Sequence, residues 1–275
     1  MDAEAFTSKQ ARLGGAEISY LERGAGQALV LLHGIGSGAR SWRNQLAALS
    51  DHFRVIAWDA PGYGRSTPLA KSAPDAADYA AALAAFLAAL GVARCHLVGH
   101  SLGALIAARF AAERPGLILS LTLASVARGH AHLPAEERER LLQGRLADVA
   151  SLGSRGMAEK RGPRLLGPDA TAAMRQSVIE TMAAVDPPGY GQAARMLSQG
   201  DAKADVARLP AAMPVQFVWA DADVITTPAA NRAIAAARPQ APVQIIASAG
   251  HALYLEKPDE FNAILRRFVV SLGAA

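Results

Sequence analysis

Short apolar runs alternate along the chain with longer segments of helical pattern. Near-continuous apolarity is typical of parallel strands covered on both faces, and regular alternation of strands and helices indicates a doubly wound α/β fold. The predicted strands are 28–32, 53–59, 94–99, 119–124, 213–220 and 243–247. The predicted helices are 41–50, 75–90, 102–114, 227–238 and 259–272. Residues 16–22 alternate in polarity, which predicts an antiparallel hairpin strand at the start of a mostly parallel sheet.

The strand pattern lapses between residues 126 and 209. Helical patterns cover 135–150, 157–165, 169–184 and 189–198, and prolines interrupt them at positions 163, 168, 187 and 188. We therefore expect a helical cap, or lid, formed by 126–209 and inserted into an α/β core formed by 1–125 and 210–275.

Composition agrees with one large domain that carries an insertion, because the chain has 275 residues and is 51% hydrophobic. Cys95 is the single cysteine, which excludes an intramolecular disulfide and a metal site made of cysteines. The net charge is +4, with basic and acidic residues interspersed. The most basic stretch, 138–164, holds seven Lys and Arg but also three acidic residues. This pattern favours solvated helix faces over a field that attracts anionic substrates, and it is not typical of a nucleic-acid interface.

The amino-terminal residues lack the apolar segment of a secretory signal. The longest apolar stretch, Tyr79–Val92, is too short to span a bilayer. We expect a cytoplasmic monomer or homodimer that acts on a small molecule, without nucleic-acid or membrane partners.

The first glycine cluster follows the strand 28–32 and has two interpretations. Gly34-x-Gly36-x-x-Ala39 fits a relaxed dinucleotide-binding fingerprint, and Asp59 stands where an acid that binds the ribose would be expected. Alternatively, the turn that begins at His33 supplies backbone N–H groups to an oxyanion. The Pro61-Gly62 turn after Asp59 counts against the dinucleotide, because it does not start a helix.

The segment Gly99-His100-Ser101-Leu102-Gly103 lies between a predicted strand and a predicted helix. This context is the one that a nucleophile elbow requires, because the serine sits on a strained turn between small residues. The N–H of Leu102, at the start of the helix, then points toward negative charge that develops at the nucleophile.

An acid and a histidine follow Ser101 in the order that such an elbow requires. Asp221 and Asp223 follow the strand 213–220, and His251 follows the strand 243–247. The carboxyl ends of these strands share one edge of the sheet with Ser101, and open α/β sheets bind their ligands at that edge.

Over nearly its whole length the chain resembles an α/β-hydrolase of the serine carboxylesterase and enol-lactonase branch. The resemblance lies in HGIGSG (33–38), DAPGYGRS (59–66), GHSLGA (99–104), DADVITTP (221–228) and GHALYLEKP (250–258). It implies Ser101 as nucleophile, His251 as base, Asp223 as acid and no cofactor or metal. It also implies an oxyanion hole made by the amides of Leu102 and Ile35, with Gly36 as the alternative to Ile35. The family often has glycine three residues before the acid, where this chain has Ala220, so Asp221 stays open as the acid.

The expected reaction is hydrolysis of a carboxylic ester or lactone through an acyl-enzyme. Three alternatives remain: C–C bond hydrolysis of ketone ring-cleavage products, cofactor-free perhydrolysis, and ligand binding without catalysis. The residues expected to line the substrate site are Gly34, Gly36, His100, Met157 and Arg161. Arg155, Arg161 and Arg164 could recognise a substrate carboxylate, although solvent-facing positions on lid helices are favoured for them.

Overall fold

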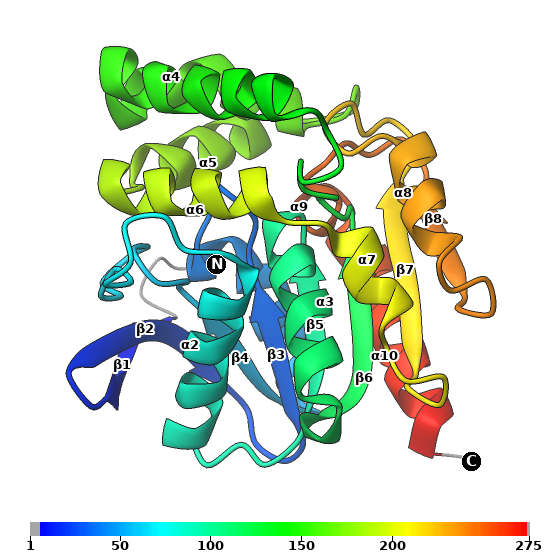
Figure 1. Ribbon diagram of the computed structural model, residues 1–275. Coiled ribbons are helices and arrows are strands. Elements are labelled where there is room, and N and C mark those ends of the chain that lie inside the picture. Colours follow the sequence, from blue (N-terminus) through cyan, green and yellow to red (C-terminus); the bar gives the residue numbers. More distant parts are fainter. Residues whose placement is uncertain (1–5, 274–275) are drawn as a thin grey trace.

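The computed structural model describes residues 6–273 and contains one eight-stranded sheet (Figure 1). The strands lie in the order β1-β2-β4-β3-β5-β6-β7-β8, with β3 to β8 parallel and β1 and β2 antiparallel to their neighbours. Their bounds are β1 Lys9–Leu13, β2 Ala16–Arg23, β3 Ala28–Leu32, β4 Arg54–Trp58, β5 Cys95–His100, β6 Ile118–Ala124, β7 Val215–Ala220 and β8 Val243–Ile246. The predicted mostly parallel, doubly wound sheet is confirmed. The outermost residues of the predicted core, 1–5 and 274–275, lie outside the described residues.

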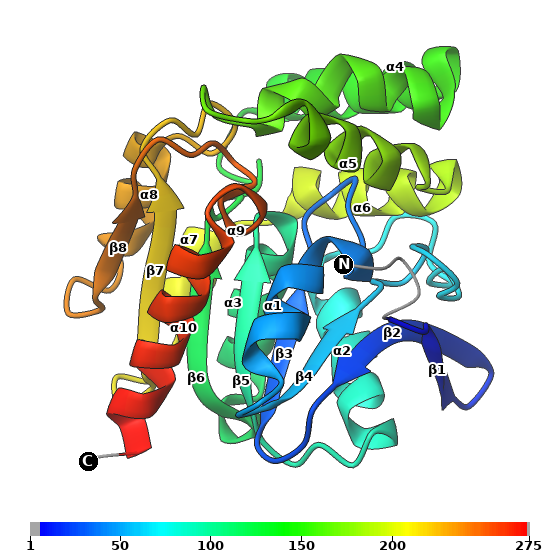
Figure 2. The ribbon, with the colours of Figure 1, turned by 180° about the vertical axis from the view of Figure 1, so that it is seen from behind.

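Helices cover both faces of this sheet. On one face lie α2 (Ala76–Ala89), α3 (Leu102–Glu113) and α8 (Pro228–Ala235), as Figure 1 shows. On the other lie α1 (Arg43–Leu49), which follows a 3-10 turn at Ala39–Trp42, and α10 (Pro258–Gly273), as Figure 2 shows. The short helix α9 (Leu253–Glu256) precedes α10.

Alternate strand residues enter two separate hydrophobic cores. In β3, Val30 and Leu32 pack with the α2 and α3 side, whereas Leu29 and Leu31 pack with the α1 and α10 side. This is the period-2 alternation of a strand that is buried on both faces, and it explains why β3 is apolar at every position.

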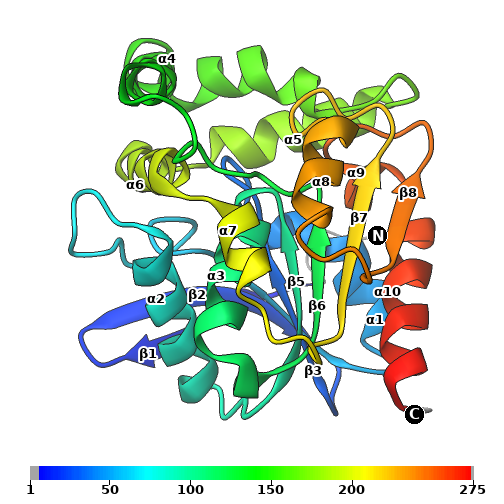
Figure 3. The same cartoon turned by 45° about the vertical axis from the view of Figure 1, so that its right-hand side comes forward.

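Helices but no strands occur between β6 and β7 within the described chain. They are α4 (Ala135–Arg161), a 3-10 turn at Gly162–Leu165, α5 (Ala172–Ala183), α6 (Pro187–Gln199) and α7 (Ala202–Ala207). Figure 3 shows α4, α5 and α6 lying above the carboxyl ends of the parallel strands; we call these three helices the helical layer. By contrast, α7 contacts α3 and α8, although the predicted insertion 126–209 includes it.

The helices predicted over 135–150 and 157–165 correspond to the two parts of α4, which are separated by a kink at Gly153, whose φ of 65° is not helical; residues 162–165 form the 3-10 turn. Two other local expectations differ from the structure. The strand β1 and the helix α9 were not expected. β8 lies at the edge of the sheet, so Val243 and Ile245 are 40% and 52% exposed rather than buried. In residues 6–273 no helix has both the length and the apolarity that a membrane crossing requires.

Candidate active site

Ser101 stands on a strained turn between β5 and α3. Its backbone angles are φ 55° and ψ −115°, a region that L-residues rarely adopt. The turn is held by the Ser101 amide, which donates to the carbonyl oxygen of Ala124 at 2.9 Å, and by the Ala127 amide, which donates to the Ser101 carbonyl at 3.2 Å. The neighbouring strand β6 and the loop after it thus hold the serine in this conformation.

The glycines on either side of Ser101 are required by close backbone packing. A β-carbon added at Gly99 would lie 2.6 Å from the α-carbon of Ala104, and one at Gly103 would lie 2.6 Å from the carbonyl carbon of Leu32. Real β-carbons do not approach other atoms this closely. Close packing therefore explains why both positions of the motif are glycine, as the sequence predicts.

The His33–Gly36 turn lies directly against the serine. A β-carbon at Gly34 would lie 3.0 Å from the β-carbon of Ser101. The His33 ring fixes this turn, because its Nδ1 donates to the Gly34 carbonyl at 2.9 Å while its Nε2 accepts from the Ala60 amide at 3.0 Å. Burial, opposed by the hydrogen bond to Gly34, lowers the pKa of His33, so the ring is neutral as this pattern requires.

Two amides beside Ser101 are available to a ligand. Within residues 6–273, the N–H groups of Ile35 and Leu102 donate to no acceptor. The Gly36 amide, the alternative predicted donor, instead points to the Tyr63 hydroxyl at 3.4 Å. The geometry therefore favours Ile35 over Gly36 as the partner of Leu102.

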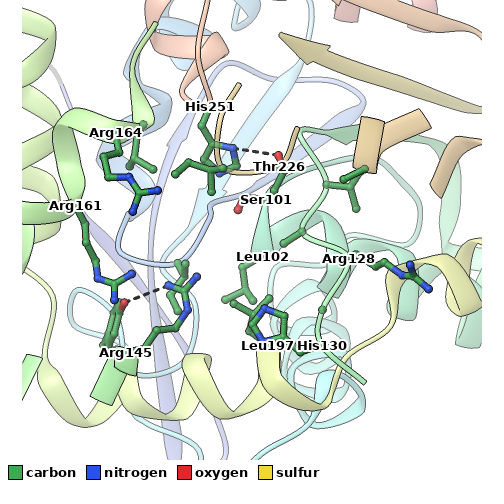
Figure 4. A pocket seen from close by; sticks show the side chains of 18 of the residues that line it. Ser101, Leu102, Arg128, His130, Arg145, Arg161, Arg164, Leu197, Thr226 and His251 are labelled. Atoms are coloured by element: carbon green, nitrogen blue, oxygen red, sulfur yellow. Dashed lines mark hydrogen bonds between the residues drawn. The ribbon is translucent and has the colours of Figure 1, made fainter. Parts of the chain in front are cut away.

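His251 and Asp223 are hydrogen-bonded to each other in the loops that follow β8 and β7. His251 Nδ1 lies 2.9 Å from Asp223 Oδ2, and both side chains are almost fully buried. The Thr226 hydroxyl donates to Asp223 Oδ2 at 2.8 Å and lies 3.2 Å from His251 Nδ1 (Figure 4). The amides of Ile225 and Thr226 donate to Asp223 Oδ1 at 2.8 and 2.9 Å. Thr226 was not among the predicted site residues, since a hydroxyl three positions after an acid is no signal by itself.

Asp223 is held ionised by these contacts. Burial raises the pKa of Asp223, but the hydrogen bond and charge of His251 and the hydrogen bonds from Thr226 outweigh it and bring the pKa to about 2. Asp221, the other candidate acid, is exposed and accepts the Ser248 amide at 2.8 Å. The structure therefore pairs His251 with Asp223 and uses Asp221 to stabilise a turn.

The loop that carries His251 is fixed from two directions. Glu256 accepts the Gly250 amide at 2.9 Å and the Gly167 amide at 2.7 Å, which ties the loop to the segment after the 3-10 turn Gly162–Leu165. His100 Nε2 donates to the His251 carbonyl at 2.7 Å, and the two rings lie 4.6 Å apart. Burial, with a smaller contribution from His251, lowers the pKa of His100 to about 3. His100 thus supports the backbone of His251 as a neutral ring.

A cavity of about 340 Å³ opens in front of Ser101 and His251 (Figure 4). It lies between the sheet edge and the helical layer, with Ile35 and Leu102 on one wall and Met182 and Tyr190 on another. Four arginines line it: Arg128, Arg145, Arg161 and Arg164. Of these, Arg161 was predicted as a substrate-binding residue, and Arg164 was considered for binding a carboxylate.

The other predicted substrate-binding residues lie elsewhere. Met157 is fully buried in the hydrophobic core and does not line the cavity, because it points from α4 toward packed side chains. Gly34, Gly36 and His100 line a smaller space of about 30 Å³, which shares Ile35, Leu165 and His251 with the cavity. Arg155 also lies outside the cavity, where it faces Glu159 at 3.9 Å on the exposed side of α4.

The dinucleotide interpretation of the first glycine cluster finds no support in the geometry. Both carboxylate oxygens of Asp59 are used within the fold: Oδ1 accepts the Ala39 amide at 2.8 Å and Oδ2 accepts the Ser19 hydroxyl at 2.7 Å. The glycine turn leads into a 3-10 turn and the short helix α1. Asp59 therefore holds the glycine turn against β2 instead of presenting its carboxylate to a ribose.

Comparison with known proteins places this arrangement in a family. Residues 27–258 match the family model described as alpha/beta hydrolase fold. The chain belongs to the α/β-hydrolase fold family. The predicted resemblance is thereby confirmed at the level of the family and its fold.

Individual α/β-hydrolase relatives cover most of the chain. It is 31% identical over 92% of its length to the dihydrolipoyllysine-residue acetyltransferase component of the acetoin cleaving system of Cupriavidus necator, and it spans 66% of that relative. It is also 31% identical to the (E)-2-((N-methylformamido)methylene)succinate hydrolase of Acinetobacter baylyi, over 66% of this chain and 67% of the relative. The structure of the enol-lactonase from Burkholderia xenovorans LB400 has a TM-score of 0.86 at 22% identity and covers 95% of this chain and 100% of its own.

Proposed function

We propose that this α/β-hydrolase is a serine hydrolase that cleaves a carboxylic ester or lactone. In this proposal Ser101 is the nucleophile, His251 the general base, and Asp223 the acid that orients it. The amides of Leu102 and Ile35 form the oxyanion hole. The observation that carries the proposal is the 2.9 Å contact between His251 Nδ1 and Asp223 Oδ2 beside a strained Ser101 that faces the same cavity.

The hydrogen bonds around His251 support its role as the base. Because its Nδ1 proton is directed to Asp223, the neutral ring keeps its lone pair on Nε2, the nitrogen that must accept the Ser101 proton. Asp223 also stabilises the imidazolium that forms when the proton is taken. The low pKa of Asp223, about 2, means that it performs this role as a carboxylate at neutral pH.

In the proposed reaction, Ser101 and the two neighbouring amides act together on the substrate carbonyl. The Ser101 oxygen attacks the substrate carbonyl, and the negative charge on the carbonyl oxygen is accepted by the Leu102 and Ile35 amides. A single such donor is typically worth about 3–4 kcal/mol of transition-state stabilisation. His251 returns its proton to the leaving alkoxide, and water activated by the same ring releases the acyl group as an acid. None of these steps requires a cofactor.

The helical layer completes the proposal as a cap over the site. The cavity takes lining from α4, α5 and α6 as well as from the sheet edge, so these helices would set which acyl groups fit. The cytoplasmic location and the monomeric or homodimeric state stay predictions.

Hydrolysis of p-nitrophenyl esters, from acetate to decanoate, tests the function. We expect turnover by the wild-type protein with an optimum in chain length, and loss of that turnover in Ser101→Ala. The matched control is Ser248→Ala, an exposed serine outside the cavity that also has a positive φ, 53°. Hydrolysis by Ser101→Ala at a rate near that of the wild type would refute the proposal.

A further inference from the structure

The guanidinium groups that line the cavity have too few acidic partners. Figure 4 shows those of Arg145, Arg161 and Arg164 gathered on one side of the cavity, across from Ser101, while that of Arg128 points away. Among residues 6–273, no aspartate or glutamate lines the cavity. The wall that faces the serine is therefore strongly positive.

Only one of the three clustered arginines has an acidic partner in the described part of the chain. Arg161 Nε donates to Asp148 Oδ2 at 2.8 Å, and that carboxylate also accepts Lys160 Nζ at 2.7 Å. Arg145 contacts the neutral hydroxyl of Tyr190 at 3.5 Å, and Arg164 makes no hydrogen bond or ion pair within residues 6–273. Two cations thus face the cavity without a counter-ion from the described part of the chain.

The wall nearer to α6 shows a second sign of a missing polar ligand. His130 lines the cavity, and its Nδ1 is a buried atom that has no hydrogen-bond partner in residues 6–273. Burial first, then the charges of Arg145 and His132, lower the pKa of His130. Buried polar atoms are normally paired, so an unpaired one at a cavity wall marks a place where a ligand or water atom is expected.

We propose that the substrate is an acyl compound that carries a carboxylate in addition to the bond being cleaved, and that Arg145 and Arg164 bind this carboxylate. The inference rests on the proposed function, because it names the substrate class of the same site. An anion relieves the repulsion among the clustered guanidinium groups and supplies their missing acceptors. A neutral acyl chain would leave both unpaired, and a cationic one would be repelled. Solvent-facing positions were predicted for Arg155, Arg161 and Arg164; Arg155 is exposed, whereas Arg161 and Arg164 line the cavity.

Two esters of the same shape and different charge test this specificity. Mono-p-nitrophenyl glutarate ends in a carboxylate, and p-nitrophenyl 5-methylhexanoate ends in a neutral isopropyl group of similar size. We expect the wild-type protein to favour the glutarate ester by roughly ten-fold or more in kcat/KM, the effect of a charge-assisted hydrogen bond. Arg145→Gln and Arg164→Gln should each lower the ratio of the two kcat/KM values by roughly ten-fold. Arg155→Gln, on the same helix but outside the cavity, should leave this ratio unchanged.

A binding measurement separates the substrate class from the catalytic proposal. Isothermal titration of Ser101→Ala with glutarate and with its neutral diamide needs no turnover. We expect glutarate to bind more tightly than the diamide, and the additional change Arg145→Gln to weaken glutarate binding by roughly ten-fold. Equal affinity for the two compounds, or equal turnover of the two esters, would overturn the carboxylate proposal while leaving the serine hydrolase intact. Selective glutarate binding without Ser101-dependent hydrolysis of either ester would support the anion site and count against the proposed function.

Discussion

The strain in the Ser101 backbone can be measured as a difference in the free energy of unfolding between two variants. A residue held in a sparsely populated region such as φ 55°, ψ −115° costs about 1–3 kcal/mol, whereas glycine adopts positive φ freely. Glycine also loses about 0.5–1 kcal/mol more on folding than alanine, because its unfolded chain is more flexible. The Ser101 side chain caps no amide of α3, so removing its hydroxyl adds little. The difference predicts that Ser101→Gly is more stable than Ser101→Ala by about 1 kcal/mol.

Urea unfolding of both variants at neutral pH measures this difference directly. Both should be inactive in ester hydrolysis, because both lack the nucleophile, so stability alone separates them. Two serine-to-glycine changes serve as controls. Ser248→Gly, at an exposed site with φ 53°, should also gain stability, whereas Ser50→Gly, at a helical φ of −68°, should lose it. If Ser101→Gly is no more stable than Ser101→Ala, the serine is not strained and this account of the elbow is wrong.

Three further predictions follow from the contacts of the site. Asp223→Asn should lower kcat by about 10⁴-fold because it disturbs the tautomer of His251, and Asp221→Asn should leave ester hydrolysis within about ten-fold of wild type; a larger loss for Asp221→Asn would reverse the assignment. The pKa of His100 is about 3 in the folded protein and 6.5 in the unfolded chain. Between pH 6.5 and 3 only the unfolded chain binds this proton, so the free energy of unfolding falls as the pH falls through this range. Urea unfolding across pH 4–6 should show that His100→Gln reduces this slope by about 1.4 kcal/mol per pH unit, and an unchanged slope would show that His100 is not buried as a neutral ring. Gly103→Ala should lower both stability and activity through its collision with β3, while circular dichroism melts and ester assays should find Gly116→Ala, which has open space around it, close to wild type; equal effects would exclude the collision.

The parallel strands could be predicted because burial on both faces leaves few polar positions. β1 gave no such signal, since only Ala11 of its five residues is buried and the strand pairs on one side alone. For β8 the prediction failed in the opposite direction. Its apolar sequence suggests full burial, but its place at the sheet edge exposes Val243 and Ile245. An edge position is set by the order of strands in space, which a local pattern does not record.

The site residues that lie next to strand ends were also predictable. Ser101, Asp223 and His251 follow the parallel strands β5, β7 and β8, and parallel strands bring their carboxyl ends to one edge. The contacts of side chains from distant segments were not predictable in this way. Met157 and Arg161 are close in sequence on α4, yet one is packed in the core and the other lines the cavity.

The arginine cluster could not be predicted from the sequence, because tertiary packing alone brings its side chains together. Arg145 lies in α4 and Arg164 in the following 3-10 turn, and the helical pattern of this segment equally fits a solvated face. Only the packing of the helical layer over the sheet edge turns them toward Ser101. The same holds for His130, which reaches the cavity from the loop after β6.

Covalent labelling of Ser101 tests the central claim most directly. The wild-type protein is treated with a fluorophosphonate, and the intact mass and the labelled peptide are determined by mass spectrometry. We predict one adduct per chain on Ser101, no adduct on Ser101→Ala, and much slower labelling of His251→Gln. Labelling of Ser101→Ala to the same extent as the wild type, or no labelling of the wild type, would contradict the assignment of Ser101 as an activated nucleophile.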